Sequence, residues 1–186
     1  MDGAPKGLLE VGGQRILDRL VESFLIGLGR LPLLVANAPE AAAWRPDLRV
    51  VPDRRPGSGT LGGLLTAVLE APAPVVCVAW DMPFVPATLL RALAEGLHGA
   101  DVCIPASGSR RGVEPLCAAY GPATGPAMAE AIDRGDLRAI GFHDSVRVAV
   151  LPEAVVRRFG EPERVFFNVN TAAELLRANG MAGMAS

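Results

Sequence analysis

Polar side chains that could do chemistry stand at the carboxyl ends of several apolar, strand-like segments. Asp53 follows "LRVVP", Asp81 follows "VVCVAW", and Asn168 and Asn170 close the segment "RVFFNVN". In a parallel sheet the carboxyl ends of the strands share one edge, and ligands bind in the crevice there. We therefore expect these four side chains to converge on one site although they are far apart in the sequence.

Asp81 is a candidate ligand for Mg²⁺. The run from Val75 to Ala79 is wholly apolar, which is typical of a strand buried on both faces, so the carboxylate that follows is expected at the sheet edge. Mg²⁺ binds one or two carboxylates and completes its shell with water and phosphate oxygens. The alternative is a structural role, in which Asp81 caps a turn before Pro83.

Asn168 and Asn170 are two positions apart, so on a strand both would project from the same face. Two amides there could position a ligand or a metal-bound water. Thr171 and Glu174 have a structural explanation, because the pattern T-x-x-E before an apolar helix is a capping box. Asn170 could equally serve as a helix cap, and both interpretations of this residue stay open.

Lys6 and a glycine-rich turn are candidates for contacts with phosphate. Lys6 is the sole lysine of the chain, in the segment "DGAPKG". The stretch "PGSGTLGGLL" places Gly57, Gly59, Gly62 and Gly63 at a strand-to-helix turn, where the backbone can approach a base or a phosphate. This stretch has neither the Walker lysine nor the GxGxxG spacing, and "GSG" is not a nucleophile elbow.

The alternation of apolar segments predicts an α/β fold with a doubly wound, mainly parallel sheet. We expect strands over residues 30–38, 48–53, 75–81, 100–106, 114–121, 145–151 and 164–170. We expect helices over 14–29, 61–71, 86–97, 126–135 and 171–180, the last of them ending at Gly180. The chain starts in a loop and continues into a helix, so the usual first strand is missing. Nothing indicates a domain boundary, and one domain over residues 1–186 is expected.

Composition excludes several classes of protein. The net charge of −2 argues against nucleic acid or a membrane surface as partner. No apolar run reaches the roughly 20 residues that span a bilayer, and the start lacks the pattern of a signal peptide, so we expect a cytoplasmic protein. The three cysteines, Cys77, Cys103 and Cys117, form no CxxC pair and are expected to be buried free thiols.

Five motifs occur in the order found in the molybdenum cofactor guanylyltransferase family and its nucleotidyltransferase relatives, which the chain resembles over nearly its whole length. These motifs are "APKGLLEVGGQRILDRL", "GTLGG", "WDMPF", "EPLCAAY" and "NVNTAAEL". The resemblance implies a Rossmann-like nucleotidyltransferase fold with GTP over the strand ends. It implies that the phosphate of molybdopterin, or of its molybdenum-bearing form, attacks the α-phosphorus of GTP and that pyrophosphate leaves.

The resemblance also implies roles for individual residues. Lys6 would contact phosphate and Asp81 would carry Mg²⁺, and these two are the expected catalytic residues. Nucleotide binding would involve Lys6, Asp53, Gly59, Leu61, Gly63 and Asp81, and binding of the second substrate would involve Glu114, Asn168 and Asn170. Expected partners are GTP and molybdopterin or the molybdenum cofactor, with molybdenum enzymes or their chaperones as further ones.

The chain departs from the family pattern at its start, where the first strand and a glycine-rich loop are absent. Either the native start lies roughly two dozen residues upstream, the length of a strand and its loop, or the protein is a non-catalytic relative. We favour the first explanation because the other site residues are present. Three alternative functions stay open: a cytidylyltransferase of the same cofactor, a guanylyltransferase of another phosphorylated small molecule, and a non-catalytic nucleotide-binding or scaffold protein.

Overall fold

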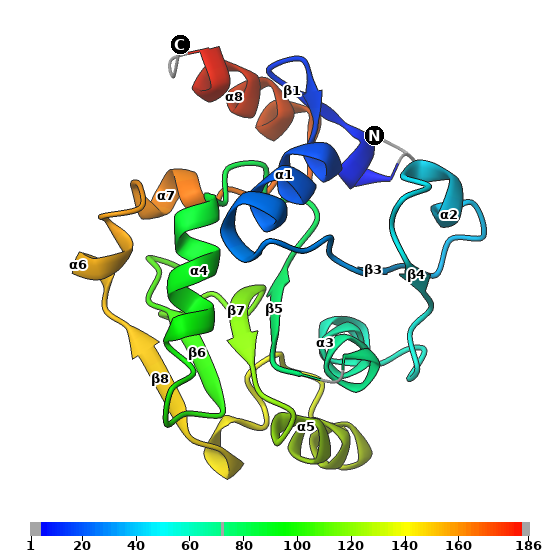
Figure 1. Cartoon of the computed structure of the whole chain (residues 1–186), viewed down its shortest axis with the longest axis vertical. Coiled ribbons are helices and arrows are strands. Elements are labelled where there is room, and N and C mark those ends of the chain that lie inside the picture. Colours follow the sequence, from blue (N-terminus) through cyan, green and yellow to red (C-terminus); the bar gives the residue numbers. More distant parts are fainter. Residues whose placement is uncertain (1–4, 72, 184–186) are drawn as a thin grey trace.

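The computed structural model describes residues 5–71 and 73–183, where helices alternate with short strands (Figure 1). The α-helices are α1 (Ile16–Leu28), α2 (Ala41–Trp44), α3 (Gly59–Glu70), α4 (Ala87–Glu95), α5 (Thr124–Asp133), α6 (Glu153–Val156), α7 (Pro162–Val165) and α8 (Ala172–Gly183). The strands are β1 (Glu10–Val11), β2 (Gln14–Arg15), β3 (Leu34–Val35), β4 (Val50–Val51), β5 (Val75–Val78), β6 (Val102–Pro105), β7 (Cys117–Tyr120) and β8 (Val148–Leu151). Short 3₁₀ helices span Lys6–Leu8 and His143–Ser145.

The predicted α/β architecture is confirmed, and the main sheet is mixed. Its four strands lie in the order β5-β7-β6-β8, with β6 and β8 parallel and β7 antiparallel to both of its neighbours. A loop with a bridge between Ala106 and Val113 joins β6 to β7. Because this connection contains no crossover helix, the two strands can pair only in opposite directions.

A gap separates the main sheet from a second pair of strands. β3 and β4 pair in parallel, with Leu34 opposite Val50 and Val35 opposite Val51. In the part of the chain that the structure describes, this pair forms a sheet of its own and makes no ladder with β5.

Helices cover both faces of the main sheet. α1 and α4 pack together on one face, and α3 and α5 pack on the other (Figure 1). Alternate residues of β6 follow this division, because Cys103 belongs to the core under α1 and α4, whereas Val102 and Ile104 belong to the core with α3 and α5. This is the period of two that a strand between two helix layers requires.

β5 differs from the expectation of a strand buried on both faces. All residues of β6 and β7 are buried, but every residue of β5, from Val75 to Val78, is only half-buried. The apolar composition of this strand matches a central position in the sheet, and the exposure arises because one of its edges faces the gap beside β3. The three cysteines are free thiols on β5, β6 and β7, as expected, but only Cys103 and Cys117 are buried, whereas Cys77 on β5 is half-buried.

Two expectations at the carboxyl end of the chain were wrong. The segment 164–170 is not a strand: α7 occupies Pro162–Val165, with proline at the helix start where its fixed φ is favourable, and irregular backbone follows. Gly180 does not end the last helix, because α8 continues to Gly183. None of the helices in residues 5–71 and 73–183 has the length and apolar character needed to cross a membrane.

Candidate functional site

Lys6, Asp81 and Asn170 meet at the edge of the main sheet where β5 ends. The ammonium nitrogen Nζ of Lys6 lies 3.4 Å from Oδ2 of Asp81 and donates a hydrogen bond to Oδ1 of Asn170. The side chain of Lys6 is 40% exposed and that of Asp81 is 14% exposed, so the pair faces solvent from a partly enclosed position. A positive charge, a carboxylate and an amide oxygen are thus concentrated at one accessible point.

Backbone contacts hold these three residues together. The N–H of Val169 donates to the backbone oxygen of Asp81 at 2.9 Å, which fixes the segment before α8 against the end of β5. Gly7 packs so closely on Trp80 that a Cβ at this position would lie 2.9 Å from the indole ring. The glycine therefore allows the backbone next to Lys6 to approach the residue that precedes Asp81.

The capping box predicted at Thr171 and Glu174 is confirmed. The N–H of Glu174 donates to Oγ1 of Thr171, and a carboxylate oxygen of Glu174 accepts from the N–H groups of Thr171 and Asn170. Because Thr171 serves as the cap, the side chain of Asn170 is free to bind Lys6 instead. The structure therefore favours the site interpretation of Asn170 over the capping one.

Glu114 reaches the same sheet edge because β7 runs opposite to β5. Val78 pairs with Cys117, Asp81 stands three residues after Val78, and Glu114 stands three residues before Cys117. The antiparallel ladder thus carries both carboxylates off the same end of the two strands. Sequence order alone cannot indicate this meeting, since it depends on the direction of β7.

The environment of Glu114 disfavours its charged form. Burial raises the pKa of this carboxyl group, and the negative charge of Asp81 adds to the increase. The N–H of Leu116, which donates to Glu114, and the nearby Arg111 guanidinium act in the opposite direction but do not cancel it. Raised pKa values are common where carboxyl groups share a binding site.

Asp53 lies further along the same edge, in a contact that the sequence analysis missed. The side-chain amide of Asn37 donates to Oδ2 of Asp53, and the N–H of Asp53 donates to Oδ1 of Asn37. Asn37 follows β3 as Asp53 follows β4, so the strand-end rule that selected Asp53 could also have found Asn37. The pair fixes the direction of the Asp53 carboxylate, whose Oδ1 lies close to Gly63.

The glycine-rich turn leads directly into α3. Gly57 and Gly59 have φ values of 83° and 56°, in the left-handed region that favours glycine. Gly59 begins α3, so the free N–H groups at the start of this helix point to the sheet edge that contains Asp53. The Leu61 side chain is fully buried in the core, which leaves only its backbone for a ligand contact.

Asn168 does not join the cluster around Lys6. Its side-chain amide donates to the backbone oxygen of Phe166 at 3.0 Å, a contact within its own segment. The expectation that Asn168 and Asn170 share a face failed because this segment is not a strand and the alternation of strand side chains does not apply.

The oxygen atoms at this edge suit a hard cation. Asp81, Glu114 and Asn170 supply carboxylate and amide oxygens, the donors that Mg²⁺ prefers. Within residues 5–71 and 73–183 there is no group of three or more histidine, cysteine, aspartate or glutamate side chains that could hold a metal by itself. A cation here would therefore depend on water and on a phosphate ligand for the rest of its shell.

Comparison with known proteins agrees with the fold. The family model described as the MobA-like NTP transferase domain matches residues 1–184. A probable molybdenum cofactor guanylyltransferase of Pelotomaculum thermopropionicum is 35% identical over 97% of this chain and 86% of its own. The corresponding protein of Carboxydothermus hydrogenoformans is 34% identical over 92% of this chain and 85% of its own.

Solved structures show the same fold. The crystal structure of molybdopterin-guanine dinucleotide biosynthesis protein A from Archaeoglobus fulgidus has a TM-score of 0.81 and 26% identity, covering 98% of this chain and 92% of that one. A nucleotidyl transferase from Methanothermobacter thermautotroptrophicus, at 23% identity and a TM-score of 0.72, covers 97% of this chain and 86% of its own and supports the fold alone.

The fold and the site edge define the class: the protein is an enzyme that transfers nucleotides. Within this class, the chain belongs to the family of MobA-like NTP transferase domains.

Proposed function

We propose that this chain transfers GMP from GTP to the terminal phosphate of molybdopterin, or of its molybdenum-bearing form. An oxygen of the acceptor phosphate bonds to the α-phosphorus of GTP, and the bond from that phosphorus to the bridging oxygen breaks, with the electron pair leaving on pyrophosphate. The names of the relatives support this choice of substrates. The observation that carries it is the meeting of Lys6, Asp81 and Asn170 at the sheet edge.

The chain's own residues would act mainly by positioning and by charge. The ammonium group of Lys6 would neutralise phosphate oxygens, and the N–H groups at the start of α3 would donate to the nucleotide. The backbone from Gly59 to Gly63 and the Asp53 carboxylate would face the base, while Glu114 and Asn170 would contact the acceptor. Nucleotidyl transfer requires no covalent intermediate when both phosphates are held in line and their charge is neutralised.

Mg²⁺ is the expected cofactor, and Asp81, with Glu114 and Asn170 beside it, would hold it. When bound, the ion would supply neutralisation of the charge on the triphosphate. The approach of Lys6 to Asp81 is compatible with this role, because the lysine can turn its ammonium group from the carboxylate to a phosphate oxygen.

The proposal extends to the domain organisation, the protein partners and the cellular compartment. We propose that residues 1–186 form one nucleotidyltransferase-like domain. Docking to a molybdenum enzyme or its chaperone would deliver the product. The cytoplasm is the compartment we propose, in agreement with the three free thiols, which a reducing compartment preserves.

The release of pyrophosphate from GTP in the presence of molybdopterin and Mg²⁺ tests the reaction. We expect Asp81→Asn to reduce the rate at least a hundredfold, the order of loss when a charge that stabilises a transition state is removed. Asp144→Asn is the matched control, since Asp144 is exposed and lies outside this edge. An undiminished rate in Asp81→Asn would remove Asp81 from the mechanism.

Calorimetric titration with GTP, CTP and ATP in the presence of Mg²⁺ tests which nucleotide base the protein prefers. Tightest binding of GTP is the expected result. Preference for CTP would indicate a cytidylyltransferase. GTP turnover with another phosphorylated acceptor but not with molybdopterin would indicate a guanylyltransferase that acts on that other small molecule. Nucleotide binding without turnover on any acceptor would support the non-catalytic alternative.

A further inference from the structure

Thr66 of α3 is a fully buried polar residue that contacts the loop after β4. Its hydroxyl group donates to the backbone oxygen of Gly62 at 2.9 Å, one helical turn earlier. The same hydroxyl oxygen accepts a hydrogen bond from the N–H of Arg54, also at 2.9 Å. A threonine hydroxyl has one proton and two lone pairs, so it can make both bonds at once. Thr66 thus links α3 to the residue that directly follows Asp53.

The bond to Gly62 fixes the direction of the Thr66 hydroxyl group. A threonine in a helix can direct its hydroxyl to the carbonyl four residues earlier, and its branched side chain has few rotamers there. Because the proton is used in this bond, a lone pair remains for the N–H of Arg54. The hydroxyl is therefore an acceptor with a fixed position.

Asp53 is held from a second side by Asn37. The N–H of Asp53 donates to Oδ1 of Asn37 at 2.8 Å, and the side-chain amide of Asn37 donates back to Oδ2 of Asp53 at 3.0 Å. Two consecutive backbone N–H groups, those of Asp53 and Arg54, are thus bonded to side chains of two different segments. Asn37 follows β3, whereas Thr66 belongs to α3, so the loop after β4 is fixed between them.

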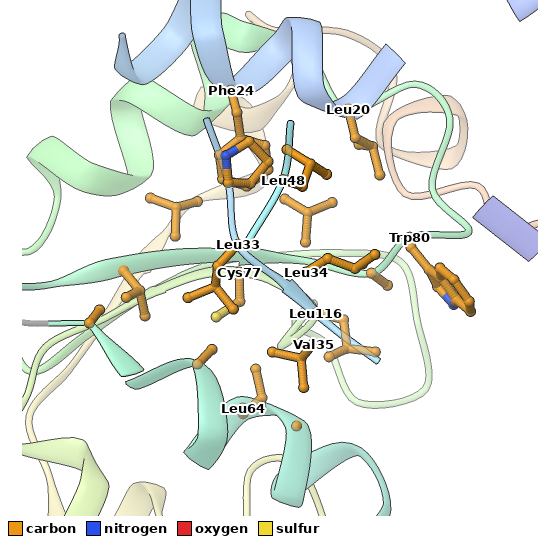
Figure 2. A pocket seen from close by; sticks show the side chains of 18 of the residues that line it. Leu20, Phe24, Leu33, Leu34, Val35, Leu48, Leu64, Cys77, Trp80 and Leu116 are labelled. Atoms are coloured by element: carbon orange, nitrogen blue, oxygen red, sulfur yellow. The ribbon is translucent and has the colours of Figure 1, made fainter. Parts of the chain in front are cut away.

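The Asp53 carboxylate stands opposite the first turns of α3. Asp53 and Gly63 line the same apolar groove between β3 and β5, which Leu64 of α3 lines as well (Figure 2). Oδ1 of Asp53 lies 3.7 Å from the position that a Cβ on Gly63 would take. Because Thr66 binds the loop to the same helix, a shift of this contact would change the space between the carboxylate and the glycine backbone.

We propose that Thr66 is a positioning residue for the nucleotide, because its hydroxyl sets where the Asp53 carboxylate lies relative to Gly63. The inference rests on the proposed function, in which these two groups face the base. Thr66 is fully buried and acts only through the backbone of Arg54. A planar base requires both groups at a fixed separation, so loss of this contact should weaken nucleotide binding and leave the chemical step unchanged.

The other contact between this loop and α3 is an ion pair. The guanidinium group of Arg54 binds the carboxylate of Glu70, but the Arg54 side chain is 53% exposed. An ion pair of this kind contributes little to holding two segments together. Removal of a buried hydroxyl, in contrast, leaves a backbone N–H without its acceptor. The contact through Thr66 is therefore the stronger constraint on Asp53.

The variants Thr66→Val and Thr124→Val form a matched pair. Both threonines are fully buried, and the hydroxyl of Thr124 donates to the backbone oxygen of Gly121 at 2.7 Å. Thr124 lies at the opposite edge of the sheet, because it follows the end of β7, which runs antiparallel to β5. Valine nearly keeps the shape of threonine, so each variant loses one buried hydroxyl group. Only Thr66→Val removes the contact with Arg54.

Amide hydrogen exchange of the full chain, followed by NMR without any ligand, tests the positioning. In Thr66→Val the amides of Asp53 and Arg54 should exchange about tenfold faster than in the unchanged chain, because local opening becomes easier. In Thr124→Val both amides should exchange at the original rate. Unchanged exchange in Thr66→Val, or equal acceleration in the two variants, would overturn the proposal.

Calorimetric titration with GTP in the presence of Mg²⁺ measures the effect on the ligand. Thr66→Val should bind GTP about tenfold more weakly, the order of effect of one lost buried hydrogen bond. Thr66→Ser keeps the hydroxyl and Thr124→Val keeps the contact with Arg54, so both should retain the affinity of the unchanged chain. Equal affinity of Thr66→Val and the unchanged chain would overturn the positioning role.

The kinetics of GMP transfer separate this inference from the proposed function. The KM for GTP should rise about tenfold in Thr66→Val, while kcat and the KM for the acceptor stay unchanged. A fall in kcat with an unchanged KM for GTP would contradict the role of Thr66 alone. Absence of transfer by the unchanged chain would contradict the proposed function, and the exchange rates of Asp53 and Arg54 would still decide whether Thr66 holds this loop.

Discussion

Lys6 donates a hydrogen bond to Asn170, a residue 164 positions further along the chain, and the same ammonium group stands 3.4 Å from Asp81. The opening turn, the end of β5 and the segment before α8 therefore meet at one point. Ion pairs between partly exposed groups contribute only about 0–1 kcal/mol to stability. The cluster therefore contributes little to the stability of the fold, and binding of a charged ligand explains better why these three side chains meet.

Replacement of Lys6 should lower the activity while leaving the stability of the fold nearly unchanged. We expect Lys6→Met to lower the rate of GMP transfer at least tenfold, because the neutral side chain cannot balance phosphate charge. Its melting temperature should stay within about 4 °C of the unchanged chain, given the small contribution of a partly exposed ion pair to stability. Arg158→Met removes an exposed positive charge that is not part of the Lys6, Asp81 and Asn170 cluster and controls for net charge. A large fall in melting temperature would instead assign Lys6 a structural role.

Glu114→Gln should change stability in a pH-dependent way. Burial raises the pKa of Glu114 in the folded state, so folding favours the protonated form. The stability that this provides is present below the unfolded pKa and is lost as pH rises through the folded one. The neutral glutamine avoids this loss, so the variant should melt at a higher temperature than the unchanged chain at pH 7.

The difference in melting temperature between Glu114→Gln and the unchanged chain should shrink as the pH falls below the ordinary pKa of glutamate, because Glu114 is then protonated in the unfolded state as well. Thermal unfolding without ligand at pH 7 and at a pH below that pKa provides the measurement. Glu163→Gln, at an exposed position of α7, is the control and should show no such gain. A difference that grows toward acid pH would contradict the burial argument.

Two helical glycines should respond to alanine in opposite directions. A Cβ on Gly27 of α1 would lie 2.5 Å from the backbone oxygen of Ala87, where α1 crosses α4, so Gly27→Ala should cost about 1–3 kcal/mol. A Cβ on Gly180 of α8 meets no atom within 4 Å, so Gly180→Ala should stabilise by about 0.5–1 kcal/mol. Urea unfolding measures both. Loss of stability in Gly180→Ala would restore the prediction that this glycine ends the helix.

Removal of the α8 cap should weaken both the helix and the site. Thr171→Ala removes the oxygen that accepts from the N–H of Glu174 and should cost about 0.5–2 kcal/mol, or roughly 1–8 °C in melting temperature. Since Glu174 also binds the N–H of Asn170, the affinity for GTP should fall as well. Thr171→Ser keeps the hydroxyl and should preserve both properties. Unchanged melting in Thr171→Ala would show that the helix start does not depend on this cap.

Much of the local structure could be predicted because it depends on neighbours in the sequence. The apolar run before Asp81 indicated β5, and T-x-x-E indicated the start of α8. The segment 164–170 misled the prediction, since an apolar run of this length fits either a strand or irregular core backbone. Here Pro162 starts a short helix, and the chain that follows bonds to the end of β5.

The sequence by itself determined which residue types stand at the ends of the strands and that the chain alternates between strands and helices. Only the tertiary structure decided which of those residues meet. The reversed direction of β7 brings Glu114 to Asp81, the irregular segment before α8 brings Asn170 to Lys6 and leaves Asn168 apart, and the open edges of β3 and β5 form a groove. Periodicity depends on local backbone geometry, whereas these meetings depend on strand order and direction, which contacts between distant segments set.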